Sequence, residues 1–500
     1  MLKIVVLNSG IAFVLALALS GDAVAKPSAF HVLNRLGYGP LPGQIQEVER
    51  EGTDRWIAGQ LAPGQESQAL ADRLAALDAL GKTPGQLARE FPNPGPKADP
   101  ARESMEFAPP RRRPGEIAQQ LAQAKLLRAV YGRRALDEAM VDFWFNHFNV
   151  TAQKGQIKWL IASYEQDVIR PRTMGKFRDL LGAVAHSPAM LYYLDNAQSV
   201  AEGAARAGKK RGLNENYARE LLELHTLGVD GGYSQTDVRE AARILTGWSA
   251  ERVRDGEPAF VFRAKLHDRG AKRVLGQEFP AGRGQDEGER LLDMLAAHPS
   301  TATFIAGKLV RRFVSDNPPG DLVARAAARF EASGGDIRQT LSLILSGPEF
   351  AGSATHKTKT PFEFVASALR ATGAATDAGI PVLDALRRLG QPPYICPSPT
   401  GYLDKPELWT TPGGLLTRLN FANALVANRI RGTTVDLDRL SAAQRDDPLQ
   451  VLESLNSGLL GGTLGDRTRG VLESALGGRR ARRSELLVGL LLGSPEFQLR

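Results

Sequence analysis

Apolar residues recur every three or four positions along most of this chain, and this spacing constrains its fold more than any other feature. Ile117, Leu121 and Ala124, for example, fall on one side of a helix. The same spacing predicts helices over residues 116–131, 135–148, 157–169, 177–184, 217–227, 238–245, 287–296, 301–313, 337–345, 362–371, 415–427 and 485–492. We therefore expect an all-α fold, a large multi-helix body with long ordered loops.

Strand patterns, in which apolar and polar residues alternate, are rare. Residues 259–263 and 272–275 together predict one minor β-hairpin. Residues 91–114, which are rich in Pro, and residues 201–212, built from Ala, Gly, Lys and Arg, predict loosely ordered loops. Residues 390–414 are also rich in Pro and Gly, but their aromatic residues favour an ordered loop packed on the body.

A short pattern occurs twice in the sequence. Residues 343–350 and 490–497 both end an apolar helix with Pro-Glu-Phe, which predicts the same helix stop in two places. We expect one helical domain over residues 26–500. The repeat leaves open a division into two helical subdomains near residues 351–360.

The N-terminus has the parts of a secretory signal peptide. A positive start with Lys3 precedes the mostly apolar residues 4–19, and residues 23–25 form an Ala-x-Ala cleavage site. We expect a signal peptide over residues 1–25 and export to the periplasm or the cell exterior; an uncleaved anchor is the alternative. The apolar run is short for a span of about 20 residues. We expect no membrane span after cleavage.

Cys396 is the only cysteine of the chain, which excludes an internal disulfide and a thiolate zinc site. The fold must therefore rely on a hydrophobic core. The net charge of +8 is mild for 500 residues, and its clusters lie beside Pro or Gly. These clusters suit contact with an anionic polysaccharide or lipid headgroups, or they are solvated loops. We expect no nucleic acid partner.

Familiar catalytic signatures are absent, including His-Glu-x-x-His, a complete phosphate-binding loop, Gly-x-Ser-x-Gly and a dinucleotide fingerprint. Three clusters remain as candidates. In the first, Asn146 and His147 lie in an aromatic helix end over residues 143–148. Buried polar groups there need hydrogen-bond partners. His147 is either a site histidine in an apolar pocket or a core histidine that caps the helix.

The second cluster is a line of polar residues on one predicted helix. Asn216, Glu220 and Glu223 fall at i, i+4 and i+7 and share a face. Two carboxylates and an amide in line could bind a cation or perform acid–base chemistry. The alternative is a charged face on which Arg219 pairs with Glu223. His225 projects from another side of the helix and is a further binding candidate.

The third cluster follows the next helix. Residues 230–237 carry a turn and helix-capping residues, which favour a structural role. Trp248 lies just after this helix and is a candidate for shaping a site. His267 and Asp268, near the predicted hairpin, are either a base with its carboxylate or a turn.

These residues carry a resemblance to a known family. The chain resembles the bacterial domain-of-unknown-function 1800 family in residues 31–39, 143–148, 214–248, 267–268, 359–363, 390–394, 415–421 and 494–497. The resemblance implies a helical, usually exported protein. It also implies an exported partner of the domain-of-unknown-function 1501 type, which is similar to alkaline phosphatases or sulfatases. It supplies no activity and no catalytic residue, and neither a cofactor nor a metal is identified.

Two functional hypotheses follow. The first, which we favour, is an accessory or binding protein of the cell envelope that acts with the exported partner or a surface polysaccharide. The second is a hydrolase or lyase outside the cytoplasm, with a pocket inside the helical body. His147, Glu220 and Glu223 would line this pocket, and the amides and the tryptophan named above would shape it.

Overall fold

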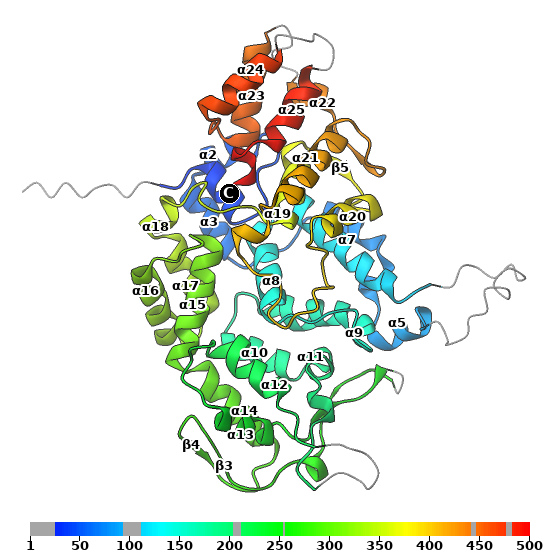
Figure 1. Ribbon diagram of the computed structural model, residues 1–500, viewed down its shortest axis with the longest axis vertical. Coiled ribbons are helices and arrows are strands. Elements are labelled where there is room, and N and C mark those ends of the chain that lie inside the picture. The colour runs from blue at the N-terminus through cyan, green and yellow to red at the C-terminus, as the bar shows by residue number, and fades with distance from the viewer. Residues whose placement is uncertain (1–25, 94–111, 204–211, 254–255, 442–446, 477–482) are drawn as a thin grey trace, which may run out of the picture.

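The computed structural model describes residues 26–93, 112–203, 212–253, 256–441, 447–476 and 483–500. The predicted signal peptide and most of the predicted loose loops lie outside these residues. Helices dominate the described part and its strands are short, which confirms the all-α prediction (Figure 1). The last helices lie at one end of the molecule, the small strands β3 and β4 lie at the other, and α8 lies between (Figure 1).

Most predicted α-helices begin and end close to the predicted positions, but α9 and α12 end earlier and continue as π-helical turns. The first half holds α1 (Ala29–Arg35), α2 (Gln44–Glu51), α3 (Thr53–Leu61), α4 (Gln68–Ala75), α5 (Pro84–Glu90), α7 (Gly115–Tyr131), α8 (Ala135–His147), α9 (Ile157–Ser163), α10 (Phe177–Ala185), α11 (Pro188–Tyr193), α12 (Asn216–Glu220) and α13 (Gln235–Ile244). The second half holds α14 (Gln285–Ala296), α15 (Pro299–Phe313), α16 (Gly320–Ala332), α17 (Ile337–Leu345), α18 (Pro348–Ala351), α19 (Pro361–Ala371), α20 (Ile380–Arg388), α21 (Pro412–Val426), α22 (Leu437–Ser441), α23 (Pro448–Leu460), α24 (Asp466–Leu476) and α25 (Arg483–Gly493).

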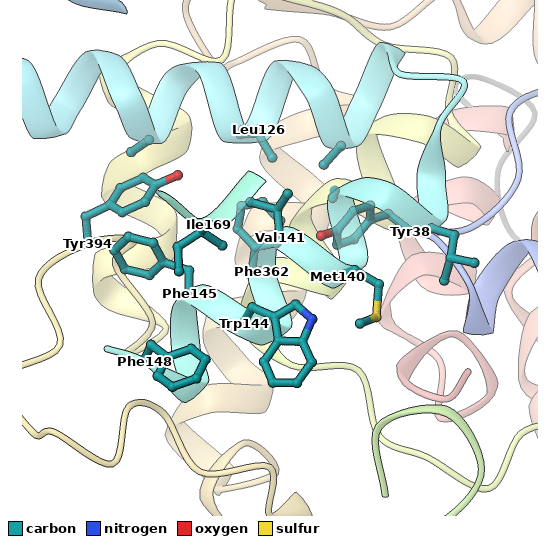
Figure 2. Close-up of a cluster of buried hydrophobic side chains, with 14 of the residues drawn as sticks. Tyr38, Leu126, Met140, Val141, Trp144, Phe145, Phe148, Ile169, Phe362 and Tyr394 are labelled. Atoms are coloured by element: carbon teal, nitrogen blue, oxygen red, sulfur yellow. The ribbon is translucent and has the colours of Figure 1, made fainter. Parts of the chain in front are cut away.

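The hydrophobic core is continuous and surrounds α8. Figure 2 shows Trp144, Phe145 and Phe148 packed with Tyr38, which follows α1, and Phe362 of α19. The first three residues are at most 4 % exposed. Burial of an aromatic side chain contributes roughly 1.5–3 kcal/mol, so the aromatic end of α8 is a major anchor of the fold.

Two helices continue as π-helical turns. α9 runs into η2 (Tyr164–Ile169), and α12 runs into η5 (Leu221–Thr226). Both segments lie inside regions that the spacing predicts as helical, over residues 157–169 and 217–227. π-helical turns are rare and occur frequently at functional sites.

The strands pair differently from the predicted hairpin. β2 (Phe260–Phe262) pairs with β1 (Trp248–Ala250), and β3 (Lys272–Val274) pairs with β4 (Gln277–Phe279). Leu275 and Gly276 have φ of 50° and 78° and form a two-residue turn, which fixes β4 as the neighbour of β3. The single hairpin over residues 259–263 and 272–275 is therefore wrong, although both strands exist. A third pair joins β5 (Ala375–Thr376) and β6 (Thr433–Thr434).

A buried charge cluster joins α1, α15, α19 and the last residues of the chain. Glu363 accepts a hydrogen bond from Arg312, and its carboxylate lies 3.2 Å from Arg500 Nη1. Arg35 Nη2 donates to the Arg500 carbonyl oxygen at 2.7 Å. Burial opposes the charge on Glu363, but Arg500 and Arg312 outweigh it and hold the pKa of this carboxyl well below its usual range. The subdivision near residues 351–360 stays a prediction.

None of the described helices is long and apolar enough to cross a membrane. Cys396 is a buried free thiol, and burial raises its pKa.

We expect Glu363→Gln to lower the free energy of unfolding by about 3–5 kcal/mol, because it leaves buried arginines without an opposing charge. Urea unfolding measures this change. The loss should shrink in acid. The pKa of Glu363 is lower in the folded than in the unfolded protein, so its charge stabilises the fold at any pH above the unfolded-state pKa. This contribution disappears as the pH falls through the folded-state pKa. Glu90→Gln, which removes an exposed partner of Lys82, is the control and should cost less than about 1 kcal/mol. Equal costs for the two variants would contradict the role of the cluster.

Candidate functional site

A cleft of about 780 Å³ lies against the C-terminal end of α8. Three parts line most of it: the last turns of α8, one face of α15, and residues 391–407 of the loop between α20 and α21. The residues that matter most for its chemistry are Asn146, His147, Phe304, Lys308, Arg312 and Tyr402.

The asparagines at the end of α8 hold the loop in place. Asn146 Nδ2 donates to the Tyr402 carbonyl oxygen, and Tyr402 N donates to Asn146 Oδ1, both at 2.8 Å. Asn149 Nδ2 donates to two further loop carbonyl oxygens, at 3.1 and 2.7 Å. Gly401 has φ of 68°, and a Cβ there would lie 2.4 Å from the Asn146 backbone oxygen. The loop therefore fits closely against α8, and the Asn146 amide is engaged by backbone.

Tyr394 fixes the other side of this loop. Its φ of 65° lies in the left-handed region, which costs a residue of this kind of order 1–3 kcal/mol. Its hydroxyl donates to Glu165, a fully buried carboxylate of η2 that also accepts from Arg170 at 3.0 Å. Burial and the nearby Glu165 raise the pKa of Tyr394 well above its ordinary value, so it stays a neutral donor. The first π-helical turn thus anchors the cleft wall.

His147 lies between two aromatic rings in the cleft. Its ring is stacked parallel to Phe143 at 6.4 Å, and the Phe304 ring lies 6.2 Å away. Nε2 is 3.2 Å from the His225 carbonyl oxygen, near the end of the second π-helical turn. Because a carbonyl only accepts, Nε2 must carry the proton. Nδ1 therefore presents a lone pair to Lys308 Nζ at 2.8 Å.

Both partners of this hydrogen bond have a lowered pKa. Burial, with the neighbouring Lys308 and His225 adding to it, holds the pKa of His147 well below its ordinary value, so the imidazole is neutral. Burial and repulsion from Arg311 lower the pKa of Lys308 to about 8, although Asp404 opposes the shift. No carboxylate oxygen of the described residues lies within 4.0 Å of Lys308 Nζ.

Arg312 is a second cation with free hydrogen-bonding capacity. Its Nη1 donates to Glu363, but Nε and Nη2 find no partner among the described residues. The side chain is only 9 % exposed. A buried donor without a partner costs roughly 1–3 kcal/mol. Both atoms are buried from solvent, so an acceptor reaches them only if the Arg312 side chain shifts toward the cleft.

The carboxylates of the cleft are mostly neutralised. Asp142 pairs with Lys125, and Asp316 and Asp404 both pair with Lys357, the latter at 3.2 Å. Glu407 is an exposed carboxylate of the lining without an ion pair among the described residues, and the cations Lys308, Arg311 and Lys405 likewise have none. The unpaired charge of the lining is therefore mainly positive, which favours an anionic ligand.

The structure places His147 and Asn146 in the cleft, and the polar line of α12 and η5 outside its lining. Asn216 Nδ2 donates to the Leu194 carbonyl oxygen at 3.2 Å, and Glu223 accepts from the Tyr233 hydroxyl at 3.2 Å. Glu220 is half-buried; burial, and then repulsion from Glu223, raise its pKa.

The expected partner of Arg219 differs as well. Arg219 pairs with Glu215 at 3.2 Å, not with Glu223. Glu223 lies in the π-helical turn, where the regular four-residue spacing no longer holds, and it accepts from Tyr233 instead. The surface pairing weighed for Glu223 is therefore wrong.

The remaining predicted residues lie outside the cleft lining. His225 is buried behind His147, and burial, with Lys308 nearby, lowers its pKa to about 3. Trp248 is buried in β1 and stacks on His186 at 4.9 Å. Its ring also lies where a Cβ on residue 288 would be, so only glycine fits there.

His267 and Asp268 both serve as cross-links between elements. His267 Nδ1 donates to the Thr246 carbonyl oxygen at 2.8 Å, and Asp268 forms an ion pair with Arg243 at 2.8 Å. Within the described ranges, no group of three His, Cys, Asp or Glu side chains is arranged to hold a metal ion.

Sequence reasoning missed Lys308 and Arg312. It recognised their helix by its apolar spacing but gave no weight to its polar side. Phe304, Lys308 and Arg312 are each four residues apart, which puts an aromatic ring and two cations in one row. This i, i+4, i+8 pattern was visible in the sequence and could have identified both cations as candidate site residues.

Comparison with known proteins gives one match. The family model described as "Protein of unknown function (DUF1800)" covers residues 31–499, nearly the whole chain, and confirms the resemblance. No curated protein and no solved structure matches the chain.

We expect Glu220→Gln to leave stability at neutral pH within about 0.5 kcal/mol of wild type or slightly above it. The pKa of Glu220 is higher in the folded than in the unfolded protein. Its protonated form therefore favours the fold at a pH below the unfolded-state pKa, and this contribution is lost as pH rises through the folded-state pKa. The variant removes a half-buried charge and its repulsion with Glu223. Thermal unfolding across pH measures the difference, which should disappear in acid. A loss of several kcal/mol at neutral pH would instead show that a partner holds this carboxylate.

Proposed function

This chain belongs to the DUF1800 family, and we propose that it is a cell-envelope binding protein whose cleft holds a segment of an acidic polysaccharide. The observation that carries the proposal is Lys308, a cleft cation held by His147 at 2.8 Å with no carboxylate of the described chain within 4.0 Å. Uncompensated positive charge in a partly desolvated cleft attracts anions more strongly than charge on an open surface.

The spacing of the cations suits a carboxylate-bearing sugar. Lys308 and Arg312 lie at i and i+4 on α15, where side chains are roughly 5–6 Å apart at Cβ. The free Nε and Nη2 of Arg312 are the two donors of one guanidinium edge, the geometry that binds a carboxylate through both oxygens. Lys308 then contacts the same sugar or its neighbour.

The walls of the cleft suit the rest of a sugar ring. Phe143, Phe304 and Tyr402 line the cleft and are each half-buried, so part of each ring faces it. Aromatic faces pack against the apolar faces of a ring, while a few polar groups fix its orientation. The volume of about 780 Å³ lies in the range of ligand sites, roughly 300–1,000 Å³. It fits a short segment of a polymer, and the predicted export would bring the protein to such polymers.

We also propose that an exported partner of the domain-of-unknown-function 1501 type acts with this protein. The resemblance to the family is the main support. Four exposed leucines in the loop that lines the cleft and at the start of α21 add to it, since large exposed apolar side chains are candidates for a contact surface. They are Leu403, Leu408, Leu415 and Leu416, at 41–59 % exposure. Co-purification from envelope extracts should recover such a partner, and should fail with these leucines changed to Ser.

We expect the protein to bind uronate oligosaccharides, such as fragments of polygalacturonate or alginate, in preference to neutral oligosaccharides of equal length. Lys308→Met should weaken binding by about 10–100-fold, because a hydrogen bond to a charged group contributes roughly 1.5–3 kcal/mol. Titration calorimetry measures both. Binding should weaken with salt, and also as pH rises through about 8, where Lys308 loses its proton.

Lys265→Met is the matched control, because it removes the same charge from an exposed position outside the cleft lining. It should bind as wild type does. If both variants lost the same affinity, the effect would come from the overall charge of the protein and not from the cleft. Equal binding of acidic and neutral oligosaccharides would contradict the proposal.

A further inference from the structure

We propose that the cleft cuts the uronate polymer it binds by β-elimination, with the Lys308 amine as the base that removes the C5 proton. This inference rests on the proposed binding of an acidic polysaccharide in the same cleft. It adds a reaction, a catalytic residue and a product to that function.

The position of the Lys308 amine is fixed in a way that suits a base. Nε2 of His147 is occupied by the His225 carbonyl oxygen, so Nδ1 is a permanent acceptor for one N–H of Lys308. An amine keeps that N–H whether or not it is protonated. After losing one proton it is therefore still held at 2.8 Å, and its lone pair is free for the cleft. His147 is a positioning residue in this scheme.

The surroundings of Lys308 allow a substantial fraction of its side chain to be a neutral amine near neutral pH. The titratable and charged groups around it are His147 from α8, His225 from η5, Arg311 and Arg312 from α15, and Asp404 from the loop. Its own burial and the repulsion from Arg311 outweigh the attraction of Asp404 and lower the pKa of Lys308 to about 8. A general base works best when its pKa lies near the working pH.

Arg312 supplies the second requirement, which is a more acidic carbon. In a uronate the C5 proton is adjacent to the C6 carboxylate, and negative charge moves onto this carboxylate when the proton leaves. The unpartnered Nε and Nη2 of Arg312 are buried from solvent, and a shift of this side chain toward the cleft would let them bind both carboxylate oxygens. Donors aimed at the carboxylate stabilise charge that develops on it in the transition state.

The bonds and protons of the step balance without a further reagent. Lys308 takes the C5 proton, and the C–H electron pair becomes the C4=C5 double bond. The C4–O4 bond breaks, and O4 leaves with the neighbouring sugar as its anomeric hydroxyl. The ammonium returns the proton to this oxygen, which restores the neutral amine. One fragment ends in an unsaturated uronate and the other in a new reducing end.

Hydrolysis by two carboxylates fits the cleft less well. A glycosidase of that kind needs one carboxyl group that stays protonated and one that stays charged and free. Asp142, Asp316 and Asp404 are each in an ion pair with a lysine. Glu407, the remaining carboxylate of the lining, is a single exposed group, so the described lining offers no pair of free carboxyl groups. The unpaired cation Lys308 matches elimination from a uronate.

The test incubates the full-length exported protein with polygalacturonate, alginate and hyaluronan. It follows the ultraviolet absorbance of the conjugated product, with mass spectrometry of the fragments. We expect unsaturated fragments, each lighter by one water than a hydrolytic product. Turnover should rise with pH through the range in which binding weakens. Lys308→Arg keeps the positive charge but cannot act as a base, so it should retain binding and lose at least about 100-fold in turnover.

Two further variants separate the roles. His147→Phe removes the acceptor that stabilises the ammonium, so the pH midpoint of turnover should move down as the rate falls. Lys265→Met should behave as wild type. Wild-type binding without unsaturated product from any of the three polymers would overturn elimination and leave the binding function standing. Undiminished turnover in Lys308→Arg would overturn Lys308 as the base. Absence of binding to all three would overturn both proposals.

Discussion

The buried contact between Glu363 and its arginines is the interaction on which the rest of the structure depends. It lies where α1, α15, α19 and the end of the chain meet. A buried ion pair adds little net stability compared with apolar packing, but removing one of its members is strongly destabilising. Since Arg312 is held by Glu363 on one side and lines the cleft on the other, the same contact sets the position of α15 and of every residue that α15 presents.

The cleft combines this fixed helix with a loop that is fixed by other means. Asn146 and Asn149 hydrogen-bond the loop backbone, and the Glu165 carboxylate holds Tyr394 in a strained conformation. A loop bound at both sides to rigid helices can keep reactive groups in position better than a free loop. This explains how a wall rich in Pro and Gly can take part in a precisely arranged site.

The fold was largely predictable from the sequence because most helices carry a clear apolar stripe. α17 begins and ends at the predicted residues, Ile337 and Leu345. The short N-terminal helices and α20 were missed because their apolar stripes cover too few turns to stand out. The longer helices α16, α23 and α24 were missed as well. Hairpin partners were mispredicted because the deciding fact was the backbone conformation of Leu275 and Gly276. His147 and Asn146 could be found from their aromatic neighbours, whereas the importance of Lys308 lies in a contact 161 residues away, which no local pattern contains.

The π-helical turn over Leu221–Thr226 makes the protonation of His147 depend on the number of residues in one helix. Deleting one residue there would close the wide turn into a regular helical turn, which moves the backbone inside the turn and leaves the residues beyond it facing much as before. The His225 carbonyl oxygen would leave His147, and Nε2 would no longer be obliged to carry the proton. The other tautomer would then place an N–H opposite Lys308, where a lone pair is needed. In a relative that lacks one residue at this point, the proton of this histidine could sit on the other ring nitrogen, even if every side chain in the cleft were kept.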